Sequence, residues 1–190
     1  MRTVYSIILA ASFALGFAQH DAVACSTTQS LQATTYRAAL RTSVEQSKYD
    51  DAELLYAKIL ALPATCIRPE DHRMGAAAAR WRGDIATALT RYQLGGDQAS
   101  ITQINQLYGK VQIRAAGLPT PRVFTWQGIM NFTPEGKKLV DRAKADFPSS
   151  GNYDGYLSPG IYVLAAGYNP NHVEVAFEVK ANETKVVNYP

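Results

Sequence analysis

The sequence is poor in the residue types from which active sites and metal centres are usually built. Its 190 residues include two cysteines and three histidines, and His72 and His172 lie far apart in the chain. No group of His, Cys and carboxylate residues has the spacing of metal ligands. The sequence also contains no G-x-S-x-G, phosphate-binding loop or H-E-x-x-H motif. We therefore expect no enzyme activity, no metal and no cofactor.

Runs of like charge and long apolar segments are missing as well. The net charge is +3, and Lys and Arg are not gathered into the clusters that mark a nucleic-acid-binding surface. The apolar run at residues 7–17 is shorter than the about 20 residues that span a bilayer. The sequence thus predicts no nucleic-acid partner and no transmembrane segment in the mature chain.

The N-terminus does contain the pattern of a secretory signal peptide. Arg2 supplies the positive start, residues 7–17 form the apolar core, and Ala22-Val23-Ala24 offers a small-residue cleavage site before Cys25. We expect residues 1–24 to be removed. The mature protein would then work outside the cytoplasm, in the periplasm or at the cell surface.

Cys25 and Cys66 would both survive that cleavage. Two cysteines in an oxidising compartment most simply pair with each other. We therefore expect a disulfide, which would constrain the unfolded chain by roughly 4 kcal/mol on the loop-entropy model. The sequence Ala22-Val23-Ala24-Cys25 also resembles a degenerate bacterial lipobox, so a lipid anchor on Cys25 is an alternative. A free, reactive Cys25 thiol is the third reading.

Residues 25–118 have the composition and periodicity of about four helices. Ala is abundant there, whereas Gly and Pro are scarce. One helical segment is predicted at residues 69–95, and the last is predicted to continue to Leu118. Apolar residues recur at spacings of three and four in four series: Tyr36, Leu40 and Val44; Ala52, Leu55, Ile59 and Leu62; Trp81, Ile85, Leu89 and Tyr92; Ile101, Ile104, Tyr108, Val111, Ala115 and Leu118.

Two stretches of this half share a small pattern of residue types. Residues 48–60 read KYDDAELLYAKIL and residues 83–92 read GDIATALTRY, each with an acid followed by Ala and an aromatic residue. Both resemble the second helix of a tetratricopeptide-type repeat, and they lie 33 to 35 residues apart, near the repeat period of about 34. The resemblance implies a concave protein-binding surface without catalysis. A plain helical bundle is the alternative.

The composition changes after Pro119 and Pro121, which we take as the boundary to a β domain at residues 122–190. Residues 173–180 alternate inward Val or Phe with outward Glu or Lys, as a half-buried antiparallel strand does. Strands are also expected at residues 123–132, 161–167 and 184–188. Residues 134–150 suit either a short helix or two strands around a bend. We favour strand in their first part, because they lie within a β meander.

Turn motifs of this half carry a second resemblance. They form an L-x-P-G-x-Y turn into a strand, followed by a G-Y turn, at Leu157, Pro159, Gly160, Tyr162, Gly167 and Tyr168. Residues 152–188 thereby resemble the carboxypeptidase-regulatory-like and PEGA groups of transthyretin-like β-sandwiches. The resemblance implies an accessory module without catalytic residues. The expected fold is α+β, with an N-terminal helical bundle or repeat followed by a small antiparallel β-sandwich.

Two functional hypotheses follow, beside a third reading as a secreted enzyme of an unfamiliar type, against which the sequence pairs no base with a nucleophile. The first is a non-catalytic structural or adaptor subunit of a bacterial cell-envelope or surface assembly, acting through contacts with envelope proteins or with its own copies. The second is a glycan- or peptidoglycan-binding module, in which Trp126, Tyr153 and Tyr156 would stack on sugar rings. The competing interpretation of these aromatic rings is that they pack in the core or over a loop.

Overall fold

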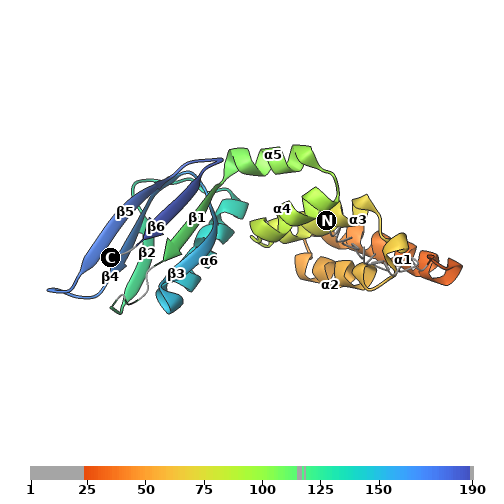
Figure 1. Ribbon diagram of the computed structural model, residues 1–190, viewed down its shortest axis with the longest axis horizontal. Helices are drawn as coiled ribbons and strands as arrows, with labels where there is room; N and C mark the ends of the chain where they lie inside the picture. The colour runs from red at the N-terminus through yellow and green to blue at the C-terminus, as the bar shows by residue number, and fades with distance from the viewer. Residues whose placement is uncertain (1–23, 115–116, 118, 189–190) are drawn as a thin grey trace, which may run out of the picture.

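The protein has the two-part α+β fold that the sequence predicts, with helices first and sheets after them (Figure 1). The computed structural model describes residues 24–114, 117 and 119–188. Apart from Ala24, the predicted signal peptide lies outside the described residues.

The helical part is built of antiparallel hairpins. α1 pairs with α2, α3 pairs with α4, and α2 also packs against α3, while α5 leads away from α4 toward the sheets (Figure 1). The bounds are Thr27–Glu45 for α1, Tyr49–Leu60 for α2, Pro69–Trp81 for α3, Ile85–Leu94 for α4 and Gln98–Leu107 for α5, with a short 3-10 helix, η1, at Ala64–Cys66.

The single helix predicted at residues 69–95 is wrong, because the chain turns between α3 and α4. Gly83 has a φ of +83°, in the left-handed region that glycine adopts without strain. The side chain of Asp84 then accepts a hydrogen bond from the backbone N–H of Thr87 at 3.1 Å and caps α4. The turn takes so few residues that apolar spacing alone does not reveal it.

The helix predicted to continue to Leu118 is also wrong beyond Leu107. Gly109–Arg114 form strand β1, in which Val111 and Ile113 are fully buried and alternate with more exposed neighbours. A Cβ atom at Gly109 would clash with the carbonyl oxygen of Lys180, so the strand begins where only glycine fits. Secondary structure thus changes from helix to strand before the two prolines. The predicted positions Ala115 and Leu118 lie outside the described residues.

In the described part of the chain, six strands form two three-stranded sheets. In the first, β1 lies between β3 (Asn152–Leu157), to which it is antiparallel, and β6 (Thr184–Asn188), to which it is parallel. In the second, β4 (Gly160–Ala166) lies antiparallel between β2 (Arg122–Trp126) and β5 (Val173–Val179). The strands predicted at 161–167, 173–180 and 184–188 are confirmed with slightly different bounds, whereas the strand predicted at 123–132 already ends at Trp126. The parallel pair is a departure from the expected antiparallel sandwich.

Helix α6, Pro134–Ser150, replaces the strand that we favoured for the first part of residues 134–150. Its start is specified locally, since the side chain of Thr133 accepts a hydrogen bond from the N–H of Gly136 at 3.0 Å. Its buried residues follow helical spacing: Leu139, Val140, Ala143 and Phe147. These signals outweigh the β context. The helix packs on β2 and β3, the strands at one side of the two sheets.

Both parts of the molecule share one apolar core. Ile85, Tyr92 and Ile104 of the helices belong to the same buried cluster as Phe147 of α6 and Tyr162 of β4. A second, smaller cluster lies between α1, α2 and α3. The sheets are therefore packed directly against the α3–α5 end of the helical part.

Three tyrosines of this core make stability sensitive to alkali. Burial raises the pKa of Tyr108 to about 12, assisted by the negative charge of Glu135, and burial also raises the pKa of Tyr153 and Tyr162. An unfolded chain ionises its phenols near pH 10. The folded state therefore binds more protons than the unfolded state above that pH. Its stability is fully present below about pH 10 and is lost as pH rises through the folded pKa values.

We expect circular dichroism and tyrosine absorbance to show cooperative unfolding as pH rises above about 10. Tyr108→Phe removes one of these ionisations, so its stability should fall less steeply over the same range than that of the wild type. Identical slopes for the two proteins would show that Tyr108 is not responsible.

Candidate functional site

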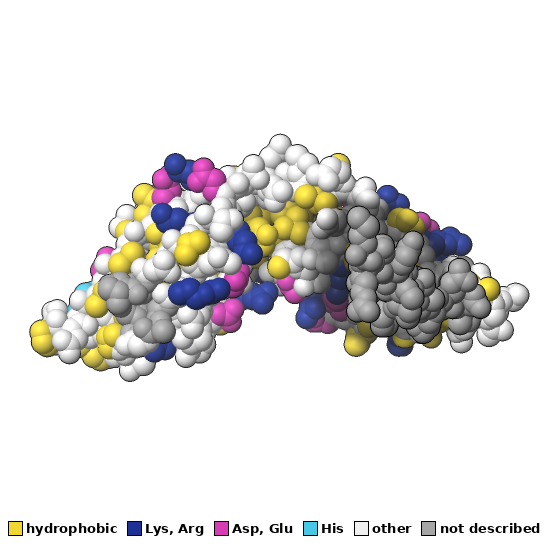
Figure 2. Space-filling model, in the orientation of Figure 1, with side chains coloured by type: hydrophobic (Ala, Val, Ile, Leu, Met, Phe, Trp, Pro, Cys, Tyr) yellow, Lys and Arg dark blue, Asp and Glu magenta, His cyan; other side chains and the backbone are white. Residues whose placement is uncertain are grey.

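The two parts meet around a hollow. Figures 1 and 2 show an arched molecule with α5 at its crown and a concave side between the helical hairpins and α6. An open pocket of about 410 Å³ lies at this junction. It is lined by Ser47, Lys48, Tyr49, Asp50, Asp51, Arg82 and Lys138.

Two hairpin turns, the first turn of α2 and helix α6 build the hollow. The α1–α2 turn contributes Ser47 and Lys48, the α3–α4 turn contributes Arg82, and α6 contributes Lys138. A Cβ atom added to Gly83 would lie 3.3 Å from the Cβ of Lys138, so this turn lies directly against α6. The walls of the hollow therefore come from segments that are distant in the sequence.

An aromatic pair lies beside the hollow. The rings of Tyr49 and Trp81 stack with centroids 6.1 Å apart and an interplanar angle of 10°. The ammonium group of Lys138 lies 5.4 Å from the centroid of the Tyr49 ring and donates a hydrogen bond to the carbonyl oxygen of Trp81. Trp81 remains 39% exposed. The pair thus leaves apolar surface open to solvent next to charged groups.

The charges of the hollow are only partly paired with one another. Arg82 Nε lies 2.9 Å from Asp50 Oδ1, and both side chains are exposed. Among the residues that the structure describes, Lys48 and Asp51 have no ion-pair partner. Asp50 and Asp51 lie in the first turn of α2, where carboxylates interact favourably with the helix dipole.

A buried ion pair holds the two sides of the hollow together. Glu135 of α6 accepts hydrogen bonds from Arg80 of α3 at 2.8 and 3.2 Å, and the two side chains are 6% and 13% exposed. Arg80 also donates to Gln103 of α5 at 2.9 Å. The Arg80 guanidinium group therefore links α3 to both α5 and α6. These bonds hold the helical hairpins and α6 in fixed relative positions on the two sides of the hollow.

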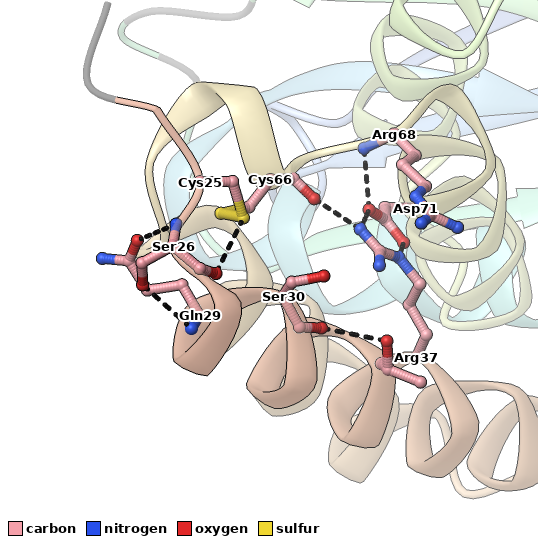
Figure 3. Close-up of a disulfide and its surroundings, with 9 residues drawn as sticks. Cys25, Ser26, Gln29, Ser30, Arg37, Cys66, Arg68 and Asp71 are labelled. Carbon is pink, nitrogen blue, oxygen red and sulfur yellow. Dashed lines mark hydrogen bonds and ion pairs between the residues drawn. A yellow bond between two sulfur atoms is a disulfide. The ribbon is translucent and has the colours of Figure 1, made fainter.

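The disulfide predicted between Cys25 and Cys66 is confirmed (Figure 3). Its S–S distance is 2.03 Å and the two Cα atoms are 5.2 Å apart. The bond uses the Cys25 sulfur that a lipid anchor or a reactive thiol would need, so it excludes both alternatives while it is intact. It ties the start of α1 to η1, far from the hollow.

The three aromatic residues proposed to bind sugars do not form one surface. Tyr153 is buried, and its hydroxyl donates to the carbonyl oxygen of Tyr156 at 3.1 Å, which is the packing that the competing interpretation of these rings expects. Trp126 lies on the other sheet, with Phe132 against it and the Lys144 ammonium 4.5 Å from its ring centroid. Tyr156 lines a separate pocket of about 140 Å³.

Sequence reasoning missed the hollow altogether. Lys48, Arg82 and Lys138 are ordinary surface residues in the sequence, and no motif links them. The local signal in the sequence was Gly83-Asp84, which follows Arg82. This pair indicates a turn between two helices, but it does not indicate that the turn packs against α6.

The described part of the chain contains no group of three or more His, Cys, Asp or Glu residues that could hold a metal ion. None of the described helices has the length and apolar character needed to cross a membrane. No family model matches the chain, and no curated protein or solved structure is significantly similar to it.

Proposed function

We propose that the mature chain is a non-catalytic adaptor or structural subunit of an extracytoplasmic assembly in a bacterial cell envelope or on a cell surface. It binds a protein partner in the hollow between the hairpin turns and α6. The observation that carries this proposal is the hollow itself, because it is shaped by both parts of the molecule and combines exposed aromatic surface with charge. Such a surface suits recognition of another chain.

The packing of the hairpins supports this proposal. Ala52 and Tyr56 are buried in α2. Ala88 and Tyr92 are buried at the equivalent positions of α4, counted from the start of each helix. A Cβ atom at Gly75 of α3 would lie 2.7 Å from the Tyr56 ring, so the two hairpins approach closely. Closely stacked hairpins are the architecture of helical-repeat proteins, which use extended surfaces to bind partners.

The disulfide supports the proposed location. Disulfides form and persist in oxidising compartments such as the periplasm and the extracellular space. The Cys25–Cys66 bond therefore agrees with the export that the N-terminal sequence predicts.

Site-specific photo-cross-linking in the native host tests the proposal. A benzophenone amino acid at Asp51, in the hollow, should yield a defined cross-link to one or two envelope proteins. The same probe at Gln106, an exposed position on α5 outside the hollow, is the matched control. Monomer alone at both positions would refute the adaptor function. Retention on isolated cell wall without any protein cross-link would favour the glycan-binding hypothesis instead.

A further inference from the structure

We propose that the hollow binds an acidic segment of the partner protein, whose carboxylates are held by Lys48 and Lys138. This inference deepens the proposed adaptor function and rests on it, because it names the chemistry of the partner at the same site. It follows from three features of the hollow. Three cationic side chains line it, its acidic side chains do not fully neutralise them, and the Lys138 ammonium already lies over the Tyr49 ring.

Three cations converge on one pocket. Lys48, Arg82 and Lys138 come from the α1–α2 turn, the α3–α4 turn and α6, and all three line the same open volume. Like charges brought together repel each other, and an anion placed among them relieves that repulsion. The packing of the hairpins against α6 therefore creates a preference for negative charge that none of the three segments has alone.

The acids of the hollow do not cancel this preference. Asp50 pairs with Arg82 at 2.9 Å, which leaves two lysines and Asp51 as the remaining charges. Lys138 gives one N–H to the neutral carbonyl oxygen of Trp81. An ammonium group has three donors, so others remain for a carboxylate.

The aromatic pair favours the same type of ligand. The ammonium of Lys138 already lies over the ring of Tyr49, so this ring is not free to receive a cationic ligand. The exposed part of Trp81 can instead pack against an apolar side chain of the bound segment. A pocket of about 410 Å³ holds a few side chains, which fits an extended segment better than a folded domain.

Fluorescence anisotropy with the mature protein tests this. The probe is a fluorescein-labelled peptide of glutamate residues around a central leucine, and a lysine peptide of the same design is its counterpart. Lys48→Glu and Lys138→Glu should each weaken binding of the acidic peptide by about fivefold or more, and salt should weaken it further. Lys137→Glu, on the same helix but outside the hollow, should leave it unchanged. Asp51→Asn should strengthen it by about twofold.

Three results would overturn the inference: tighter binding of the lysine peptide, acidic-peptide binding that ignores both lysine variants, or a lysine-dependent preference for an anionic polysaccharide such as polygalacturonate. Circular dichroism of both variants shows whether they fold. If Lys138→Glu does not fold, Lys48→Glu still tests the inference, because it changes an exposed side chain. A protein cross-link from Asp51 that survives both lysine substitutions would refute the acidic segment and keep the adaptor function. If the protein with intact lysines gives no cross-link from Asp51 and binds no acidic peptide, both the adaptor function and the acidic segment are refuted.

Discussion

Replacing Asp71 by Ala should lower the free energy of unfolding by about 3–5 kcal/mol. The Asp71 side chain is fully buried and receives two hydrogen bonds from Arg37, at 2.7 and 2.9 Å (Figure 3). It also accepts the backbone N–H of Arg68 at 2.8 Å, which fixes the start of α3. Removing the carboxylate leaves the largely buried guanidinium of Arg37 without its counter-charge, and that uncompensated charge is the main source of the loss.

Urea unfolding followed by circular dichroism measures this effect. Glu70→Ala is the matched control, because Glu70 is the neighbouring acid and forms an exposed pair with Arg68 at 3.4 Å. Exposed pairs contribute at most about 1 kcal/mol. Replacing both Arg37 and Asp71 by Leu should destabilise less than Asp71→Ala, because no unpaired charge then remains. Equal losses for Asp71→Ala and Glu70→Ala would contradict the argument.

Replacing both cysteines by Ala should lower the free energy of unfolding by about 4 kcal/mol in the loop-entropy model. The bond joins residues 41 apart in the sequence, and the loop that it closes contains α1 and α2. Without it the unfolded chain gains conformational freedom. The folded chain also loses the tie between the start of α1 and η1.

Urea unfolding with and without a thiol reductant checks this second prediction. The reductant should lower the stability of the wild type to nearly that of the Cys25→Ala/Cys66→Ala variant. It should leave the variant itself unchanged. A wild-type stability that does not respond to complete reduction would contradict the prediction.

The two effects should not be additive. Arg37 donates a hydrogen bond to the carbonyl oxygen of Cys66 as well as to Asp71, so the disulfide and the ion pair hold the same segment (Figure 3). Neighbouring interactions of this kind couple by about 0.5–3 kcal/mol. The variant that combines Asp71→Ala with Cys25→Ala and Cys66→Ala should therefore lose less free energy of unfolding than the sum of the two separate losses.

Several elements could be predicted because their signals are local. Strand β5 alternates apolar and polar residues, and its pairing with β4 buries Phe177 and Val179 as that pattern predicts. The disulfide could be predicted because only two cysteines remain after residue 24. In each case the preference depends on residue type and spacing within the chain.

Two of the wrong predictions have opposite causes. Val111 continues the helical spacing of α5, yet it lies in β1, because pairing with β3 and β6 buries it more fully than another helical turn would. For α6 the error was the reverse. A strand context was preferred over the cap at Thr133 and the helical spacing of Leu139 and Val140.

By itself, the sequence determined the α+β order of the chain, the cysteine pair and the strands with clear alternation, since these follow from local preference and from composition. Only the tertiary structure decided that Lys48, Arg82 and Lys138 share one hollow and that Tyr153 lies in the core. These arrangements depend on which surfaces pack against each other. Packing between distant segments depends on burial of shared apolar area, which no single segment encodes.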